Sequence, residues 1–194
     1  SLLLVVMTLL SSEIAADADV MAVKMAKGSG VKVSCVLNFR KNLWKWSSSM
    51  SSVELARDVM PKFLKYVDVV IGNEEDADNV LGIKANDTEV DAGNISHDSY
   101  PSVAKQICKK FDNIELVAIT LRESISANEN NWGAMLYEKA TETVCFSPLQ
   151  GSEYSSYAIN NIVDRVGGGD SFAAGLIYSI CEDSSKDLQY QLDF

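Results

Sequence analysis

The residues best suited to chemistry stand near the C-terminal end of the sequence, where Gly167, Gly168 and Gly169 precede Asp170. Glycines let a backbone approach a ligand closely, and their amides at the start of a helix would form a phosphate site. A carboxylate repels phosphate unless it accepts the proton of a hydroxyl that attacks the phosphorus. The pattern therefore suits a phosphoryl-transfer site with Asp170 as general base. The string alone favours a simpler alternative, in which Asp170 only caps a helix.

Two polar side chains, Asn38 and Arg40, follow residues 31–37, an apolar run rich in β-branched side chains and typical of a buried strand. Alternate residues of an extended chain point to the same side, so Asn38 and Arg40 would face one ligand together. A planar guanidinium binds a carboxylate or a phosphate through two parallel hydrogen bonds. Without such a context, an arginine beyond a strand is usually a surface residue.

Two more segments have polar residues after or at the end of an expected strand. Asn73 follows residues 67–71, and Asp76 stands three positions later. Their oxygens are the hard ligands that Mg²⁺ and its waters prefer, but the same pattern is typical of a capped acidic helix start. Thr120 lies at the end of the apolar residues 116–121, where a threonine is unremarkable by itself.

Residues 162–175, IVDRVGGGDSFAAG, closely resemble the C-terminal motif of the ribokinase-like sugar kinases, in the form typical of the 2-keto-3-deoxygluconate kinase branch. The resemblance implies that Asp170 is the catalytic base and contacts the substrate. It also implies that the amides of Gly167, Gly168 and Gly169 form an anion hole for the transferring phosphoryl group, with Gly167 and Gly169 contacting the nucleotide. A dinucleotide-binding motif is a weaker interpretation, because the spacing is not GxGxxG.

Residues 36–40, VLNFR, resemble the strand-end motif of the same branch, which usually reads Asp-Leu-Asn-Tyr-Arg. The resemblance implies that Asn38 and Arg40 bind the sugar acid or the transferring phosphate. Val36 stands where relatives usually carry the aspartate, and a valine can neither accept a hydrogen bond nor support a metal-bound water.

Two further motifs match in the family's order. Residues 73–76 resemble the Asn-x-x-Glu motif, with Asp76 one methylene shorter than the usual glutamate. The resemblance implies that Asn73 and Asp76 organise Mg²⁺ through water. It also implies that Thr120 contacts the nucleotide, together with Arg122, which stands where many relatives have glycine.

The resemblance implies a fragment of a longer kinase that phosphorylates the 6-hydroxyl of 2-keto-3-deoxygluconate with ATP and Mg²⁺. The partners would be the sugar acid and ATP. Relatives also have an N-terminal lid, which could make a homo-oligomer, and C-terminal helices, so we expect negligible turnover from these 194 residues alone. Two alternatives stay open: a kinase of a neutral sugar, as in fructokinase or ribokinase, and a nucleotide- or sugar-acid-binding module without turnover.

The elements that must position these residues alternate along the chain. Strands are expected at residues 1–10, 31–37, 67–71 and 116–121, separated by helical patterns at 13–27, 52–65, 74–81 and 99–111. This rhythm is typical of an α/β fold with a mainly parallel sheet. The resemblance specifies a ribokinase-like three-layer α/β/α fold that lacks the lid and the C-terminal helices, with residues 1–194 as a single kinase core domain.

Local patterns give finer expectations. Ile14, Ala18, Met21 and Met25 recur at helical spacing, which places them on one helix face. Residues 134–137 and 143–146 could pair as a hairpin, and 159–166 should be extended. Loops are expected at residues 84–98, 124–132 and 150–157, and a further helix after the glycines.

Composition excludes several classes of protein. The chain has 17 Lys+Arg and 27 Asp+Glu, a net charge of −10, which argues against binding to nucleic acid or to an anionic membrane surface. Four scattered cysteines and a single histidine, His97, give no zinc pattern. Buried, reduced thiols and a cytoplasmic location are expected. The apolar run 1–10 is too short to span a bilayer.

Overall fold

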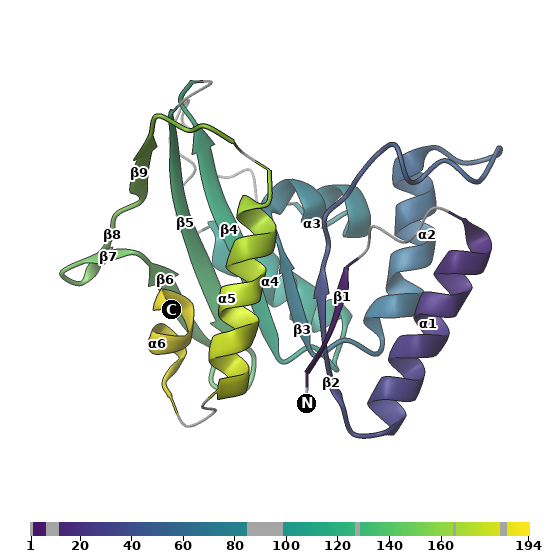
Figure 1. Cartoon of the computed structure of the whole chain (residues 1–194). Coiled ribbons are helices and arrows are strands. Elements are labelled where there is room, and N and C mark those ends of the chain that lie inside the picture. Colours follow the sequence, from purple (N-terminus) through teal and green to yellow (C-terminus); the bar gives the residue numbers. More distant parts are fainter. Residues whose placement is uncertain (1, 7–11, 85–98, 127–128, 165, 183–185) are drawn as a thin grey trace.

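The computed structural model describes residues 2–6, 12–84, 99–126, 129–164, 166–182 and 186–194. A sheet runs through the molecule in the order β1-β2-β3-β4-β5-β6, and β9 also pairs with β5 (Figure 1). Its strands are β1 (Leu2–Val6), β2 (Lys32–Val36), β3 (Val69–Gly72), β4 (Leu116–Ser124), β5 (Glu129–Glu138), β6 (Thr143–Ser147) and β9 (Tyr157–Asn160). A separate small hairpin pairs β7 (Leu149–Gln150) with β8 (Glu153–Tyr154).

The strands β1 to β4 pair in parallel, whereas β5, β6 and β9 add to the sheet in antiparallel pairs. Helices follow most of the strands, as the sequence pattern predicted. They are α1 (Glu13–Gly28), α2 (Ser52–Leu64), α3 (Glu74–Leu81), α4 (Ser99–Lys110), α5 (Gly168–Glu182) and α6 (Leu188–Asp193). The expected α/β class is confirmed.

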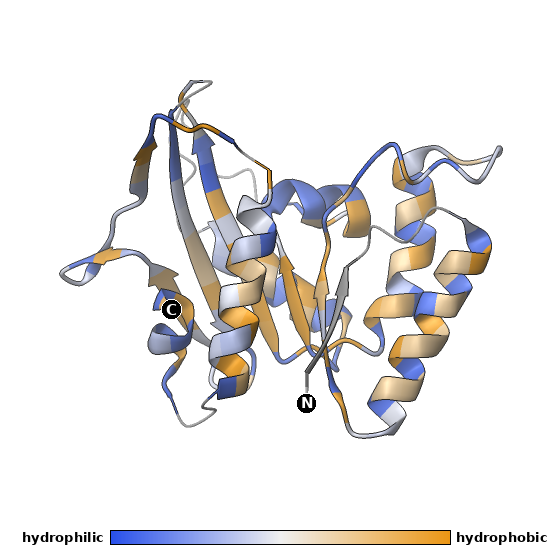
Figure 2. Cartoon of the chain, in the orientation of Figure 1, coloured by the Kyte–Doolittle hydropathy of each residue, from blue (hydrophilic) through white to orange (hydrophobic). Residues whose placement is uncertain are grey.

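Helices cover both faces of the sheet (Figure 1). The helices α1 to α4 pack into one core with Val70 of β3, and α5 and α6 pack into a second core with Val69 and Ile71 of the same strand. Successive residues of a strand point to opposite faces, so these three neighbours divide between the two cores. The central strands are hydrophobic along most of their length (Figure 2), as expected for strands that are buried on both sides.

The carboxyl ends of the parallel strands meet at one edge of the sheet. Strand β2 ends at Val36, and β3 ends at Gly72, which lies opposite Ile119 of β4. The polar residues that follow these positions are therefore brought together at this edge, where open α/β sheets bind their ligands.

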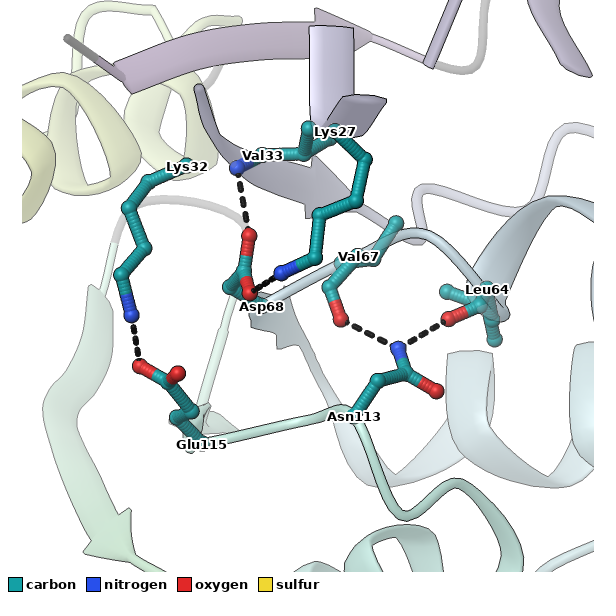
Figure 3. Close-up of polar contacts among 8 residues, drawn as sticks. All are labelled: Lys27, Lys32, Val33, Leu64, Val67, Asp68, Asn113 and Glu115. Carbon is teal, nitrogen blue, oxygen red and sulfur yellow. Dashed lines mark hydrogen bonds and ion pairs between the residues drawn. The ribbon is translucent and has the colours of Figure 1, made fainter. Parts of the chain in front are cut away.

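At the opposite edge, the amino edge, where the parallel strands begin, Asp68 is fully buried and connects the starts of three strands (Figure 3). Its carboxylate accepts hydrogen bonds from the Lys27 side chain and, at 2.8 Å, from the backbone N–H of Val33. Its backbone carbonyl accepts from the N–H of Glu115 at 2.8 Å. A buried carboxylate is tolerated when it is paired and hydrogen-bonded in this way.

Two further contacts reinforce this amino edge (Figure 3). The Asn113 side-chain amide donates to the carbonyls of Leu64 at 2.8 Å and Val67 at 2.6 Å. Lys32 and Glu115 form an ion pair on the surface. The polar groups of this edge are thus bound to one another.

The four apolar residues that were predicted to share one face of α1 do share it, but that face points away from the sheet. Ala16 and Val23 are the buried residues of this helix, and 82% of the surface of Ile14 is exposed. The small side chains pack beside β2, and periodicity alone could not tell which side of the helix the sheet would cover. All four residues of the predicted face are exposed: Ile14, Ala18, Met21 and Met25.

The prediction of a loop over residues 124–132 is wrong. β4 continues to Ser124, β5 begins at Glu129, and their pairing extends to Ser124 opposite Asn130. Backbone pairing holds the two strands together beyond the region where apolar side chains mark them. The predicted hairpin of residues 134–137 and 143–146 is confirmed inside the longer strands β5 and β6.

The remaining local expectations are met in part. The predicted loop 150–157 contains β8 and most of the small hairpin, which turns at Gly151 with a φ of +68°. The extended stretch expected over 159–166 ends at Asn160, because Asn161 has a left-handed φ of +59°. The expected N-terminal strand is confirmed over Leu2–Val6. Most of the predicted loop 84–98, with His97, lies outside the described residues.

The cysteines are free, as expected, but only Cys35 and Cys108 are buried; Cys181 is exposed. Burial raises the pKa of the Cys108 thiol to about 11, which keeps it protonated at neutral pH. Within the described ranges, we find no helix with both the length and the apolar character needed to cross a membrane.

Candidate functional site

Two adjoining cavities open at the carboxyl edge of the sheet, and together they are lined by every residue that the sequence singled out. The smaller cavity has a volume of about 190 Å³ and the larger about 620 Å³. They share Asn73, Thr120 and residues 167–169. The predicted residues of the smaller cavity are Asn38, Arg40, Asn73, Asp76, Thr120 and residues 167–170, and Arg122 lines the larger one.

The glycine turn leads into the start of α5 at the junction of the two cavities. Gly167 has a φ of +87°, a conformation that favours glycine. The N–H of Ser171 donates to the Gly167 carbonyl at 2.8 Å, which is the first hydrogen bond of the helix. The N–H groups of Gly168, Gly169 and Asp170 therefore lie in the first turn without a helical acceptor, at the positive end of the helix dipole. This geometry favours an anion.

Open space lies in front of these glycines. A Cβ added to Gly168 or Gly169 would meet no other atom within 4 Å, and neither residue has a positive φ. Packing within the described residues therefore does not require glycine at these two positions. Their lack of side chains leaves the amides accessible from the cavities.

Asp170 is exposed and lies in the first turn of α5, in the wall of the smaller cavity. The residue at the N-cap position is Gly167, whose carbonyl accepts the first helical hydrogen bond, so Asp170 is not the cap that the simpler alternative requires. Its carboxylate makes no hydrogen bond to any described residue, and it can accept a proton or a hydrogen bond from a ligand.

Asn38 and Arg40 line the same cavity, but strand alternation is not what brings them together. β2 ends at Val36, and Asn38 has a left-handed φ of +34°. Arg40 is exposed, and its Nε donates to Asn38 Oδ1 at 3.5 Å, the limit of a hydrogen bond. The guanidinium therefore remains available to an anionic group in the cavity.

Asn73 and Asp76 form a capping box at the start of α3. Asn73 Oδ1 accepts from the Asp76 N–H at 2.6 Å, and Asp76 Oδ2 accepts from the Asn73 N–H at 3.3 Å. The other carboxylate oxygen of Asp76 accepts from the N–H of Phe39 at 2.8 Å. Burial raises the pKa of the Asp76 carboxyl, and its hydrogen bonds from the backbone partly oppose this shift.

Direct coordination of Mg²⁺ by these two residues would compete with hydrogen bonds that they already make. Their side-chain oxygens are already engaged in the capping box and in the contact with Phe39. Within the described part of the chain, no three His, Cys, Asp or Glu side chains converge to hold a metal ion. A contact between Mg²⁺ and this pair through water stays a prediction.

On the other side of the glycine turn, Thr120 and Arg122 come from β4. The Thr120 hydroxyl donates to the Gly72 carbonyl at 3.4 Å, which joins the ends of β3 and β4. Arg122 lies opposite Trp132 in the β4–β5 ladder. The side-chain amide of the buried Asn130 is oriented so that both its nitrogen and its oxygen have hydrogen-bond partners. In this orientation, the Asn130 side-chain oxygen accepts from Arg122 Nη2 at 3.2 Å.

Sequence reasoning missed several residues of the larger cavity. Asn130 and Trp132 were hidden because their segment reads as a polar loop, although the aromatic Trp132 within it is typical of a strand. Asp164 was part of the glycine motif but had no assigned role; its Oδ1 accepts from the Val166 N–H at 2.8 Å, just before the turn. Glu74 also lines this cavity, and burial raises the pKa of its carboxyl.

No family model matches the chain, and no curated protein matches it. Solved structures do. The chain is similar to a 2-dehydro-3-deoxygluconokinase from Thermotoga maritima, with 40% sequence identity and a TM-score of 0.70, over 89% of this chain and 44% of that one. It is also similar to a PfkB family carbohydrate kinase from Listeria grayi, with 26% identity and a TM-score of 0.76, over 98% of this chain and 50% of that one.

The chain thus spans about half the length of the solved structures that it matches. A fructokinase from Xylella fastidiosa, at 16% identity and a TM-score of 0.57, shares the fold alone. These likenesses confirm the ribokinase-like fold that the sequence motifs implied.

Proposed function

Because the structural neighbours of this chain are PfkB-family carbohydrate kinases, we propose that residues 1–194 form the core domain of an ATP-dependent sugar-acid kinase. The acceptor would be 2-keto-3-deoxygluconate, phosphorylated at its 6-hydroxyl to 2-keto-3-deoxy-6-phosphogluconate. One observation carries the proposal. Four segments that are far apart in the sequence, each with a kinase-like motif, line two cavities that meet at the glycine turn.

In this proposal, the smaller cavity takes the reacting end of the sugar acid. The Asp170 carboxylate accepts the proton of the 6-hydroxyl as that oxygen attacks the γ-phosphorus of ATP. The new P–O bond forms while the bond to the β-phosphate oxygen breaks, and ADP leaves. The exposed position of Asp170 and its lack of a partner within the described residues support this role.

The negative charge on the transferring group is stabilised by the amides of the glycine turn, Gly167, Gly168 and Gly169, of which Gly168 and Gly169 lie in the first turn of α5. Fixed N–H donors of this kind contribute roughly 10²–10³ in rate in other enzymes. The same turn borders the larger cavity, where Thr120 and Arg122 would contact the nucleotide. Asn38 and Arg40 would bind the carboxylate of the sugar acid or the transferring phosphate.

The substrate is tested with the protein as the cell makes it, in an assay that couples ADP release to a change in absorbance. With MgATP, we expect turnover with 2-keto-3-deoxygluconate and little with fructose. Arg40→Ala should raise the KM for the sugar acid by at least about tenfold, because it removes the cation that pairs with the carboxylate. Asp58→Asn, an exposed acid on α2, is the matched surface control.

The outcomes separate the alternatives. Equal turnover with fructose, unaffected by Arg40→Ala, would point to a neutral-sugar kinase. Nucleotide binding without ADP release from either sugar would point to a binding module. We expect the active protein to work in the cytoplasm on small molecules, and a homo-oligomer remains a prediction.

A further inference from the structure

The loop between β2 and α2 carries Arg40, and protein contacts fix its backbone on both sides of that residue. Before it, the N–H of Phe39 donates to Asp76 Oδ1 at 2.8 Å. After it, the N–H of Leu43 donates to the Arg40 carbonyl at 2.8 Å, and Trp44 is only 2% exposed in the main core. The side chain of Arg40 is exposed, but its backbone is anchored.

The contact between Asp76 and Phe39 is more than helix capping requires. A capping box uses one oxygen of the third residue, and here Asp76 Oδ2 serves the Asn73 N–H. Asp76 Oδ1 is left for a partner 37 residues away in the sequence, the N–H of Phe39. The acceptor of this hydrogen bond is the half-buried carboxyl group of Asp76, and a buried acceptor is costly to leave without a partner.

The anchor lies next to the sharpest change of direction in the loop. Asn38 has a φ of +34°, in the left-handed region, which asparagine tolerates better than other residues with a side chain but which is still less favourable than the usual conformations. The N–H of Leu37 is bound to the Ile71 carbonyl at 2.8 Å before this residue, and Asp76 holds Phe39 directly after it. The chain is thereby turned from β2 toward the cavity.

We propose that Asp76 is a positioning residue: its carboxylate fixes the backbone at Phe39 and, through it, holds Arg40 at the cavity that faces the glycine turn. The assignment of Arg40 to the sugar acid rests on the proposed function. The anchoring of Phe39 by Asp76 does not depend on the proposed function. This anchoring is a separate task from the water-mediated contact with Mg²⁺ that the sequence resemblance implies for Asp76.

The first test measures the exchange of backbone amides with solvent by NMR, without any ligand. Asp76→Ala keeps the bond from the residue-76 N–H to Asn73 Oδ1 but removes both carboxylate contacts. We expect the Phe39 amide to exchange at least about tenfold faster than in the unmodified chain. The matched control is Asp78→Ala on the same helix, whose carboxylate pairs with Arg57 and Lys84 on the surface, and which should change Phe39 exchange less than twofold.

Should Asp76→Ala fail to fold, Asp76→Asn keeps the size of the side chain and one acceptor oxygen, and it should speed Phe39 exchange by a smaller but measurable factor. Phe39 exchange that stays at the unmodified rate in the folded variants would overturn the proposal.

The second test measures binding of 2-keto-3-deoxygluconate by calorimetry without ATP or Mg²⁺. We expect Asp76→Ala to weaken binding by about tenfold, and Arg40→Ala to add little in the double variant, since both act through the same guanidinium. The Mg²⁺ concentration needed for ADP binding should not change. The opposite pattern, an altered Mg²⁺ requirement with unaltered sugar-acid binding, would assign Asp76 to the metal. If the unmodified protein binds no sugar acid, the proposed substrate fails, and the exchange test still decides whether Asp76 anchors the loop.

Discussion

The polar side chains at the two edges of the sheet differ in burial and in whether the protein itself binds them. At the amino edge, the Asp68 carboxylate is fully buried and bound to Lys27 and to the N–H of Val33 (Figure 3). At the carboxyl edge, Asp170 is exposed with no protein partner in the described residues, and Arg40 has one long contact. The Asp68 carboxylate is bound by the protein, whereas the Asp170 carboxylate leaves its acceptor oxygens, and Arg40 its donors, for a ligand.

This difference separates a carboxylate that the protein itself binds from one that is open to a ligand. Burial makes an unpaired charge costly, so a buried carboxylate must be bound by the protein. An exposed carboxylate is solvated by water and can exchange that water for a substrate. Asp76 combines both conditions, since it is half-buried, bound by backbone N–H groups and still part of the cavity wall.

The largest effect is expected from a substitution at the carboxyl edge. Asp170→Asn should lower kcat by at least about 100-fold, because an amide cannot accept the hydroxyl proton. The free energy of unfolding should change by less than about 0.5 kcal/mol, because the side chain is exposed. A coupled ADP assay and urea unfolding of the same preparation measure the two quantities. Turnover within threefold of the unmodified protein would remove Asp170 from the mechanism.

The next largest effect is expected from a substitution at the amino edge. Asp68→Asn replaces the acceptor of two hydrogen bonds and leaves Lys27 without its partner. We expect a loss of about 2–3 kcal/mol in the free energy of unfolding, below the usual cost for a fully buried pair because the Lys27 side chain is 39% exposed and can reach water. Asp112→Asn on the surface is the control. A loss below about 0.5 kcal/mol would mean that the pair does not hold this edge together.

Two glycines of the same turn are expected to differ in how their substitution affects stability and ADP binding. Gly167→Ala should cost about 1–2 kcal/mol in stability, because a side chain is strained at a φ of +87°. Gly169→Ala should cost no stability and could add up to about 1 kcal/mol within the helix, yet its methyl group should weaken ADP binding. Urea unfolding and calorimetry with ADP are the measurements. Equal ADP affinity in the Gly169 variant and the unmodified protein would separate this turn from the nucleotide site.

The smallest effect concerns the surface ion pair of the amino edge. Lys32 and Glu115 have half-exposed side chains, at 52% and 57%. Lys32→Gln should therefore change the free energy of unfolding by less than about 1 kcal/mol, and less still at high salt. A larger loss that persists in high salt would show that this pair, and not Asp68 alone, organises the edge.

Much of the site could be predicted because its motifs are local in sequence. The polar residues after β2 and β3 each follow a hydrophobic strand, and parallel strands bring such ends together. The glycine turn and its aspartate were recognised from their own motif, because the preceding strand β9 is exposed and antiparallel. The alternation of strands and helices predicted the α/β fold for the same reason.

The long-range contacts could not be predicted. Nothing in the residues around Asp76 indicates that Phe39 would be its partner, and nothing around Asp68 indicates Lys27. The exposed face of α1 is also a matter of tertiary packing, because two sides of that helix carry apolar residues and only the sheet decides between them. The pairing of β4 with β5 at Asn130 was hidden because polar residues join strands through backbone hydrogen bonds that leave no hydrophobic pattern.

The most direct test of the contrast between the two edges is an NMR titration of the chain with ADP. We expect the amide resonances of residues 167–170, Thr120 and Arg122 to shift as ADP is added, while those of Val33, Asp68 and Glu115 stay in place. Shifts confined to the amino edge, or an unchanged glycine turn at millimolar ADP, would contradict the assignment of the carboxyl edge as the ligand site.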